Sequence, residues 1–153
     1  MKMLDFLNEK AVSADLKAAT KEEVIRELVD LLVTAQVIKD KERLVKILLE
    51  REALGSTGVG QGVAIPHGKC EGIRELVAAF GLSRAGVNFD SLDGEPASIF
   101  FLLVAPEDSA GPHLKALARI SRFLKDKYFR DTLRAAKDEK TIIKIIKQED
   151  AKK

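Results

Sequence analysis

A glycine-rich stretch between residues 55 and 68 constrains this chain more than any other part of its sequence. It contains five of the ten glycines and one of the two histidines, His67. Glycine allows positive φ angles and the close approach of a backbone to a partner. Because the stretch lies between a predicted helix and a short apolar strand, we expect a loop shaped to present His67.

The size and charge of the chain limit what it can be. A length of 153 residues suits one domain that buries roughly 68 to 70% of its unfolded surface, and we expect a single domain over 1–153. The net charge of +2 comes from 26 basic and 24 acidic residues spread along the chain. This gives no basic stripe for a phosphate backbone, so we expect no nucleic-acid partner.

The sequence also favours a cytoplasmic location. The first ten residues interrupt their apolar side chains with Asp5 and Asn8 and have no small-residue cleavage site, unlike a signal peptide. The longest apolar run, residues 99–105, is too short to cross a bilayer, so direct membrane insertion is not expected. The one cysteine, Cys70, cannot form an internal disulfide, which fits a reducing compartment.

Hydrophobic periodicity predicts two helices before the glycine-rich stretch. A short edge strand is expected around residues 12–16. A capping box at Thr20 begins a helix over about residues 20–36. Asp40 can cap a second helix that ends near Leu54.

The remaining chain predicts strands followed by helices. Apolar or β-rich runs bounded by turn residues predict strands at 63–65, 76–82, 87–89 and 99–104. Gly86 separates the second of these from the third, and strands 87–89 and 99–104 can pair as a hairpin. A helix follows from Gly111, with shorter helices around 127–136 and 139–147. The predicted fold class is therefore α/β, with a mixed central sheet of about five strands flanked by helices.

Both histidines follow a proline, as Pro66-His67 and Pro112-His113, and each comes shortly after an apolar strand. If strands 63–65 and 99–104 run in the same sense, their ends open onto one rim of the sheet and the two imidazoles can meet there. Each histidine can also be an ordinary surface residue, although the glycine context disfavours this for His67.

The predicted surroundings of His67 and His113 suit phosphoryl chemistry. A neutral imidazole can attack a phosphoryl group with one nitrogen while the other donates a hydrogen bond, and N–H groups of a glycine loop can hold the phosphoryl oxygens. Asp108 or Ser109 can cap the helix that carries His113, and Pro112 suits its first turn. An anion bound there would be favoured by the helix dipole.

Arg51 lies one turn beyond Leu48, close to the apolar stripe of its helix. It can be a cation that stabilises the helix C-terminus, or a guanidinium directed at an anion beside the glycine loop. The residues alone leave both roles open.

Other sites fail on spacing. Gly68-Lys69 resembles the end of a P-loop, but Val63 stands where a glycine is required and Cys70 replaces the following Ser or Thr. Residues 58–62 lack the final glycine of a dinucleotide fingerprint. His67 and Cys70 are half a zinc site with no second half. We therefore expect no metal and no cofactor.

A long motif reads Arg51-Glu52-x-Leu54-Gly55-Ser56-Thr57-Gly58-x-Gly60-x-Gly62-x-Ala64-Ile65-Pro66-His67-Gly68. It resembles the signature of the fructose and mannitol type of enzyme IIA, from the bacterial phosphoenolpyruvate-dependent sugar phosphotransferase system. Later segments at 92–96, 99–106 and 113–117 match in order and spacing, so the resemblance covers about residues 8–146. It is most similar to the stand-alone fructose-type and nitrogen-regulatory enzymes IIA, since no IIB or IIC domain fits this length.

The resemblance implies a phosphoryl carrier without a cofactor. His67 corresponds to the residue that accepts a phosphoryl group from the histidine phosphocarrier protein and passes it to an enzyme IIB. His113 and Arg51 correspond to the groups that stabilise it, and Thr57, Gly58, Gly60 and Gly62 to the phosphate-binding loop. The alternative is a nitrogen-regulatory enzyme IIA whose phosphorylation regulates target proteins.

Overall fold

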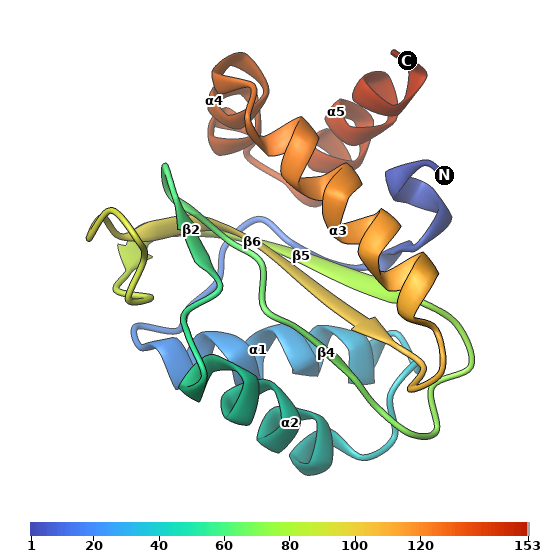
Figure 1. Ribbon diagram of the computed structural model, residues 1–153. Coiled ribbons are helices and arrows are strands. Elements are labelled where there is room, and N and C mark those ends of the chain that lie inside the picture. The colour runs from blue at the N-terminus through green and yellow to red at the C-terminus, as the bar shows by residue number, and fades with distance from the viewer. Residues whose placement is uncertain (153) are drawn as a thin grey trace.

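Six strands form one mixed sheet at the centre of the computed structural model, which describes residues 1–152 (Figure 1). The strand order is β1-β5-β6-β3-β2, with β4 also paired to β6. The α/β class and the mixed sheet are confirmed, with one strand more than expected. The strands are β1 (Leu7–Ser13), β2 (Gly58–Gly60), β3 (Val63–Ala64), β4 (His67–Lys69), β5 (Val77–Val87) and β6 (Ala97–Ala105).

Strand β6 is the centre of the sheet and is apolar along nearly its whole length. Ile99, Phe101 and Leu103 pack into the core on one face, and Phe100 and Leu102 pack into the core on the other. Side chains of a strand alternate between faces, and helices cover both faces here. A continuous apolar run is therefore what this position requires.

The helices form a layer on each side of the sheet (Figure 1). Helices α1 (Lys21–Thr34) and α2 (Lys41–Ala53) cover one face, and α3 (Ala110–Leu124), α4 (Lys127–Ala135) and α5 (Glu139–Ala151) cover the other. A short 3-10 helix, η1 (Met3–Asp5), precedes β1. No helix within residues 1–152 is both long enough and apolar enough to span a membrane.

Two of the three predicted caps are present. The third is not: Ser109 is the N-cap residue of α3, but its hydroxyl donates to the Pro106 carbonyl oxygen at 2.8 Å and caps no helix N–H. The Thr20 side chain accepts a hydrogen bond from the Glu23 backbone N–H at 3.3 Å, and the Asp40 side chain accepts one from the Arg43 N–H at 3.1 Å. Each satisfies a backbone donor that the first turn of a helix leaves free. These caps fix where α1 and α2 begin.

Two strand predictions need correction. Residues 76–82 and 87–89 do not form separate strands, because β5 continues to Val87 through an irregularity in its pairing with β6. Gly86, with φ of +78°, lies in this irregularity and does not end the strand. Strand β1 begins at Leu7, earlier than expected, although it is an edge strand paired with β5. The expected hairpin with β6 is present, but it is formed by β5 as a whole.

Candidate functional site

Strands β3 and β4 place His67 beside the end of β6. Both run parallel to β6, and His67 stands opposite Leu103. Pro66 separates the two short strands, and its carbonyl oxygen accepts a hydrogen bond from the Leu103 N–H at 2.9 Å. His67 is thus the first residue of a short strand. The backbone around it is held by the buried Leu103 of β6 and does not lie in a free loop.

The chain continues from β6 into α3, whose first turn brings His113 to the same place. The ring centroids of His67 and His113 lie 5.6 Å apart, with an angle of 63° between the ring planes. His113 is buried, with 7% of its surface exposed, while His67 is half-buried. The expected meeting of the two imidazoles at one rim of the sheet is confirmed.

Hydrogen bonding distinguishes the two nitrogens of His67. Its Nδ1 lies 2.7 Å from the carbonyl oxygen of Ile65. A carbonyl oxygen can only accept a hydrogen bond, so Nδ1 carries the proton of the neutral ring. The lone pair of that ring is then on Nε2, which is the nitrogen able to attack an electrophile.

His113 has a spare hydrogen-bonding group. Its Nε2 is buried and has no hydrogen-bond partner among the described residues. A buried polar atom without a partner is costly and calls for a reason. A phosphoryl oxygen bound beside His67 would supply the missing partner.

Both histidines are held in the neutral form. Burial lowers the pKa of His67, and the positive charge of Arg51 lowers it further, while the hydrogen bond to Ile65 and the charge of Glu52 act in the opposite direction. Burial is also the main cause of the lowered pKa of His113, and repulsion from a protonated His67 ring and from Lys69 lowers it further. A neutral His67 retains its nucleophilic lone pair at cellular pH.

Arg51 is in the last turn of α2. Its Nη1 donates a hydrogen bond to the Gly55 carbonyl oxygen at 2.8 Å, which fits the helix-terminus role. Its charge also acts on His67. The guanidinium has five N–H donors, so one bond to Gly55 leaves others for an anion. The two roles considered for Arg51 are therefore compatible.

Thr57 is buried, and its side chain faces Glu52. Its N–H donates to Glu52 Oε1 at 3.1 Å, and its hydroxyl donates to Oε2 of the same carboxylate. Its carbonyl oxygen accepts a hydrogen bond from the Ile65 N–H at 3.0 Å. The hydroxyl is thus occupied within the protein, and Thr57 holds the segment that carries His67.

The three predicted loop glycines lie in the hairpin of β2 and β3, and each has a structural reason of its own. A Cβ on Gly58 would lie 2.5 Å from Ser91 Oγ, and one on Gly62 would lie 2.3 Å from an Arg134 nitrogen. Gly60 has φ of +97°, a conformation that L side chains rarely adopt. The Gly58 N–H already donates to Ser56 Oγ at 2.9 Å. Phosphate binding by these glycines stays a prediction.

A shallow groove of about 660 Å³ borders the hairpin and α3. Val59 and Leu92 at its edge are 52% and 82% exposed, and Leu114, next to His113, is 66% exposed. Val63, which also lines the groove, is buried and belongs to the core. Large apolar side chains exposed at the edge of a groove are typical of a surface that contacts other proteins.

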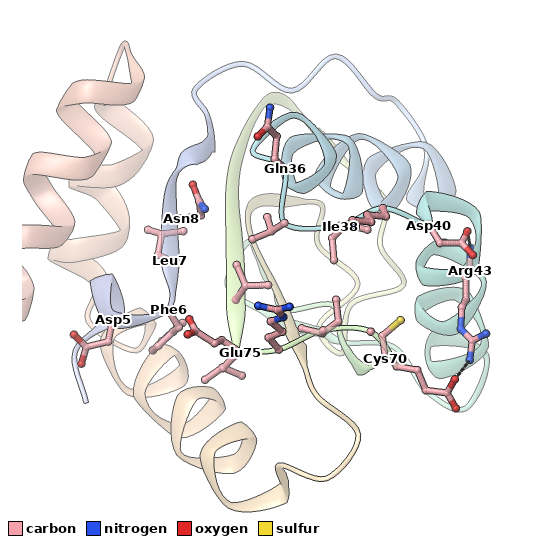
Figure 2. A pocket seen from close by; sticks show the side chains of 18 residues that line it. Asp5, Phe6, Leu7, Asn8, Gln36, Ile38, Asp40, Arg43, Cys70 and Glu75 are labelled. Carbon is pink, nitrogen blue, oxygen red and sulfur yellow. Dashed lines mark hydrogen bonds and ion pairs between the residues drawn. The ribbon is translucent and has the colours of Figure 1, made fainter.

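A second cavity, of about 810 Å³, lies beyond the end of β4 and contains none of the predicted site residues. Figure 2 shows Cys70 at its wall, close to Arg43, which is paired with Glu71 at 3.0 Å. Burial raises the pKa of the Cys70 thiol against the opposing effect of Arg43. A protonated thiol is a poor nucleophile, so this cavity does not compete with the histidines as a reactive centre.

Glu52 is the residue of this site that sequence reasoning missed. It lies four residues after Leu48, on the buried stripe of α2, and only 4% of its side chain is exposed. A charged residue at that spacing is an available signal, because ionisable groups are almost never fully buried unless they are paired.

The comparisons with known proteins agree with one another. Residues 5–149 match the protein-family model described as "Phosphoenolpyruvate-dependent sugar phosphotransferase system, EIIA 2". The chain is 39% identical over 147 residues to a "Nitrogen regulatory protein" of Bradyrhizobium diazoefficiens, with 95% of each chain covered. It is 38% identical over 150 residues to the "PTS system fructose-specific EIIABC component" of Bacillus subtilis, of which the match covers 98% of this chain and only 24% of the relative.

Solved structures show the same fold. The nitrogen regulatory protein IIA-Ntr of Neisseria meningitidis superimposes with a TM-score of 0.86 at 32% identity, covering 93% of this chain and 97% of that one. Enzyme IIA mannitol of Escherichia coli, solved in a complex with phosphorylated enzyme IIB mannitol, superimposes with a TM-score of 0.77 at 22% identity, covering 92% and 96%.

Proposed function

Because the chain belongs to the EIIA 2 family of the phosphoenolpyruvate-dependent sugar phosphotransferase system, we propose that it is a cytoplasmic phosphoryl carrier. His67 accepts a phosphoryl group from the histidine phosphocarrier protein and passes it to an enzyme IIB. The observation that carries this proposal is the pairing of the two histidines, with Nδ1 of His67 held by Ile65 and Nε2 left free.

The transfer needs no proton movement. Nε2 of His67 forms a bond to phosphorus as the phosphorus–nitrogen bond of the donor breaks, and the donor nitrogen keeps that electron pair. His67 retains its proton on Nδ1, so the phosphorylated ring carries a positive charge. The hydrogen bond to the Ile65 carbonyl becomes charge-assisted and therefore stronger.

His113 and Arg51 stabilise the transferred group. The unpartnered Nε2 of His113 donates a hydrogen bond to a phosphoryl oxygen, and the free N–H groups of Arg51 neutralise part of its charge. Phosphoryl transfer depends mainly on such positioning and electrostatic stabilisation. No cofactor is required in this mechanism.

Donor and acceptor use the same docking surface in turn. This surface surrounds His67 and includes the exposed Leu114 beside His113 and the groove edged by Val59 and Leu92. Encounters of this kind bury less than about 1,200 Å² in total, so that release is fast.

The direct test is incubation with phosphoenolpyruvate, enzyme I and the phosphocarrier protein, followed by intact-mass measurement. We expect one acid-labile, base-stable phosphate on the wild-type protein and none on His67→Ala. A phosphate that persists on His67→Ala would refute the assignment of His67.

A second candidate is a regulator of the nitrogen-regulatory kind, in which phosphorylation of His67 changes affinity for target proteins. The end-to-end match with relatives of that name favours it. The two functions differ in the fate of the phosphate. Rapid loss from His67 to an added fructose-type enzyme IIB supports the carrier, whereas retention supports the regulator.

A further inference from the structure

Glu52 is a buried carboxylate one residue from Arg51, and its side chain is 4% exposed. Burial of a charge is costly unless the charge is paired and hydrogen-bonded. Glu52 meets both conditions. Its Oε1 lies 2.9 Å from Nζ of Lys21 at the start of α1, and the carboxylate accepts both the N–H and the hydroxyl of Thr57.

These contacts continue to the reacting ring. The Thr57 carbonyl oxygen accepts the Ile65 N–H at 3.0 Å, and the Ile65 carbonyl oxygen is the group that holds Nδ1 of His67 at 2.7 Å. A hydrogen-bonded path therefore runs from Glu52 through Thr57 and Ile65 to His67. The hydrogen bond that a histidine nitrogen donates determines the tautomer and the orientation of the ring. Residues that hold the Ile65 carbonyl oxygen in place therefore help to set both for His67.

Other charged groups near Glu52 are few. Lys21 also lies 3.4 Å from Asp90 and stands over the Phe89 ring at 4.9 Å. Arg51 is the neighbour on the same helix, and its charge reaches His67 with the opposite sign to that of Glu52. Glu52 is thus the negative group that offsets Arg51 at the imidazole.

We propose that Glu52, anchored by Lys21, is a positioning residue for phosphoryl transfer. Its carboxylate fixes Thr57 and, through Ile65, keeps the His67 proton on Nδ1, so that Nε2 faces the incoming phosphoryl group with its lone pair. Its negative charge also stabilises the positive ring of the phosphorylated state. This role rests on the function proposed above, which assigns transfer to His67.

The variant Glu52→Gln tests the role, because it keeps the size of the side chain and removes the charge and one acceptor. We expect single-turnover transfer from the phosphocarrier to slow by between about 10- and 100-fold, the loss typical when a group that orients a histidine is removed or a reacting group is displaced. The matched control is Glu50→Gln, which makes the same charge change at an exposed position of the same helix. It should transfer at the wild-type rate.

The tautomer of His67 gives a readout that a purely structural role would not change. Nitrogen-15 shifts of the imidazole should show Nδ1 protonated in the wild type and in Glu50→Gln, and a mixture of tautomers in folded Glu52→Gln. This measurement needs no phosphoryl transfer. It therefore separates a failure of this inference from a failure of His67 phosphorylation, which is read by mass on the wild-type protein.

Wild-type rate and wild-type nitrogen shifts in Glu52→Gln would overturn the role. If Glu52→Gln does not fold, Glu52→Asp replaces it, since this change keeps the charge and withdraws the carboxylate from Thr57. Slower transfer with a mixed tautomer in Glu52→Asp supports positioning, and wild-type values for both refute it.

Discussion

Nδ1 of His67 lies 2.7 Å from the carbonyl oxygen of Ile65, the residue two positions before it. This contact is local in sequence, yet it depends on the short strands β3 and β4 with Pro66 between them. It decides which nitrogen of the ring can react, and the predictions below follow from it and from the groups arranged around Nε2.

The variant His113→Ala should still be phosphorylated, but slowly. It removes the buried Nε2 that has no partner within the described part of the protein and leaves the nucleophile in place. Loss of one preorganised donor typically costs about 10² to 10³ in rate. Quench-flow transfer from the phosphocarrier measures the effect, and Lys115→Ala, an exposed change on the same helix, is the control. A wild-type rate in His113→Ala would show that His113 has no part in transfer.

Replacement of Arg51 by lysine should slow transfer although the charge is kept. A planar guanidinium can bond Gly55 and a phosphoryl oxygen together, whereas an ammonium on a flexible stem is a point charge. The control is Arg43→Lys on the same helix, where the guanidinium pairs with Glu71. If Arg51→Lys and the wild type transfer at equal rates, Arg51 only stabilises the helix end.

The transfer rate should stay constant as the pH falls to about 6.5, where an ordinary histidine is already half protonated. Both pKa values are lowered, chiefly by burial, so both rings stay neutral as the pH falls to the unperturbed value of about 6.5. The rate should decrease only below that value. Carbon-bound ring protons followed by NMR measure both titrations directly, and a titration of His67 above about 6.5 would contradict this prediction.

The same shifts make the folded protein sensitive to acid. In the unfolded chain these histidines bind protons from about pH 6.5 downwards, while in the folded chain they resist protonation. Stability is therefore fully present above that pH and decreases as the pH falls below it. Denaturant unfolding at a series of pH values measures the effect. As the pH falls, the free energy of unfolding should decrease less for His113→Ala than for the wild type. An equal dependence on pH in both proteins would show that the acid sensitivity does not come from His113.

The sequence predicted the parts of the fold that local patterns determine. Strand β6 is a continuous apolar run, and α1 and α2 begin at side chains that cap them. Strands β2 and β4 were missed because they are three residues long and contain glycine. Pairing makes them strands: β2 pairs with the neighbouring β3, and β4 pairs with the distant β6.

The candidate site also has parts that local patterns predict and parts that they do not. The two Pro-His pairs and the parallel strands were enough to bring the imidazoles together. The role of Thr57 was not readable, because its partner Glu52 reaches it across the turn that ends α2. The support from Lys21 comes from another helix, and such contacts depend on tertiary packing that no local pattern encodes.

Protein partners should contact the surface around His67. Phosphoryl groups must reach a donor and then an acceptor without release to water, so both partners must cover the same ring. We expect NMR titration with the unlabelled phosphocarrier to shift signals of residues 55–69 and 109–114.

The variant Leu92→Ala should weaken binding of the phosphocarrier because Leu92 is exposed at the edge of the groove. Tyr128→Ala is the matched control, since Tyr128 is similarly exposed on α4 but does not line the groove. Shifts confined to helix α1, or equal weakening by both changes, would place the docking surface elsewhere.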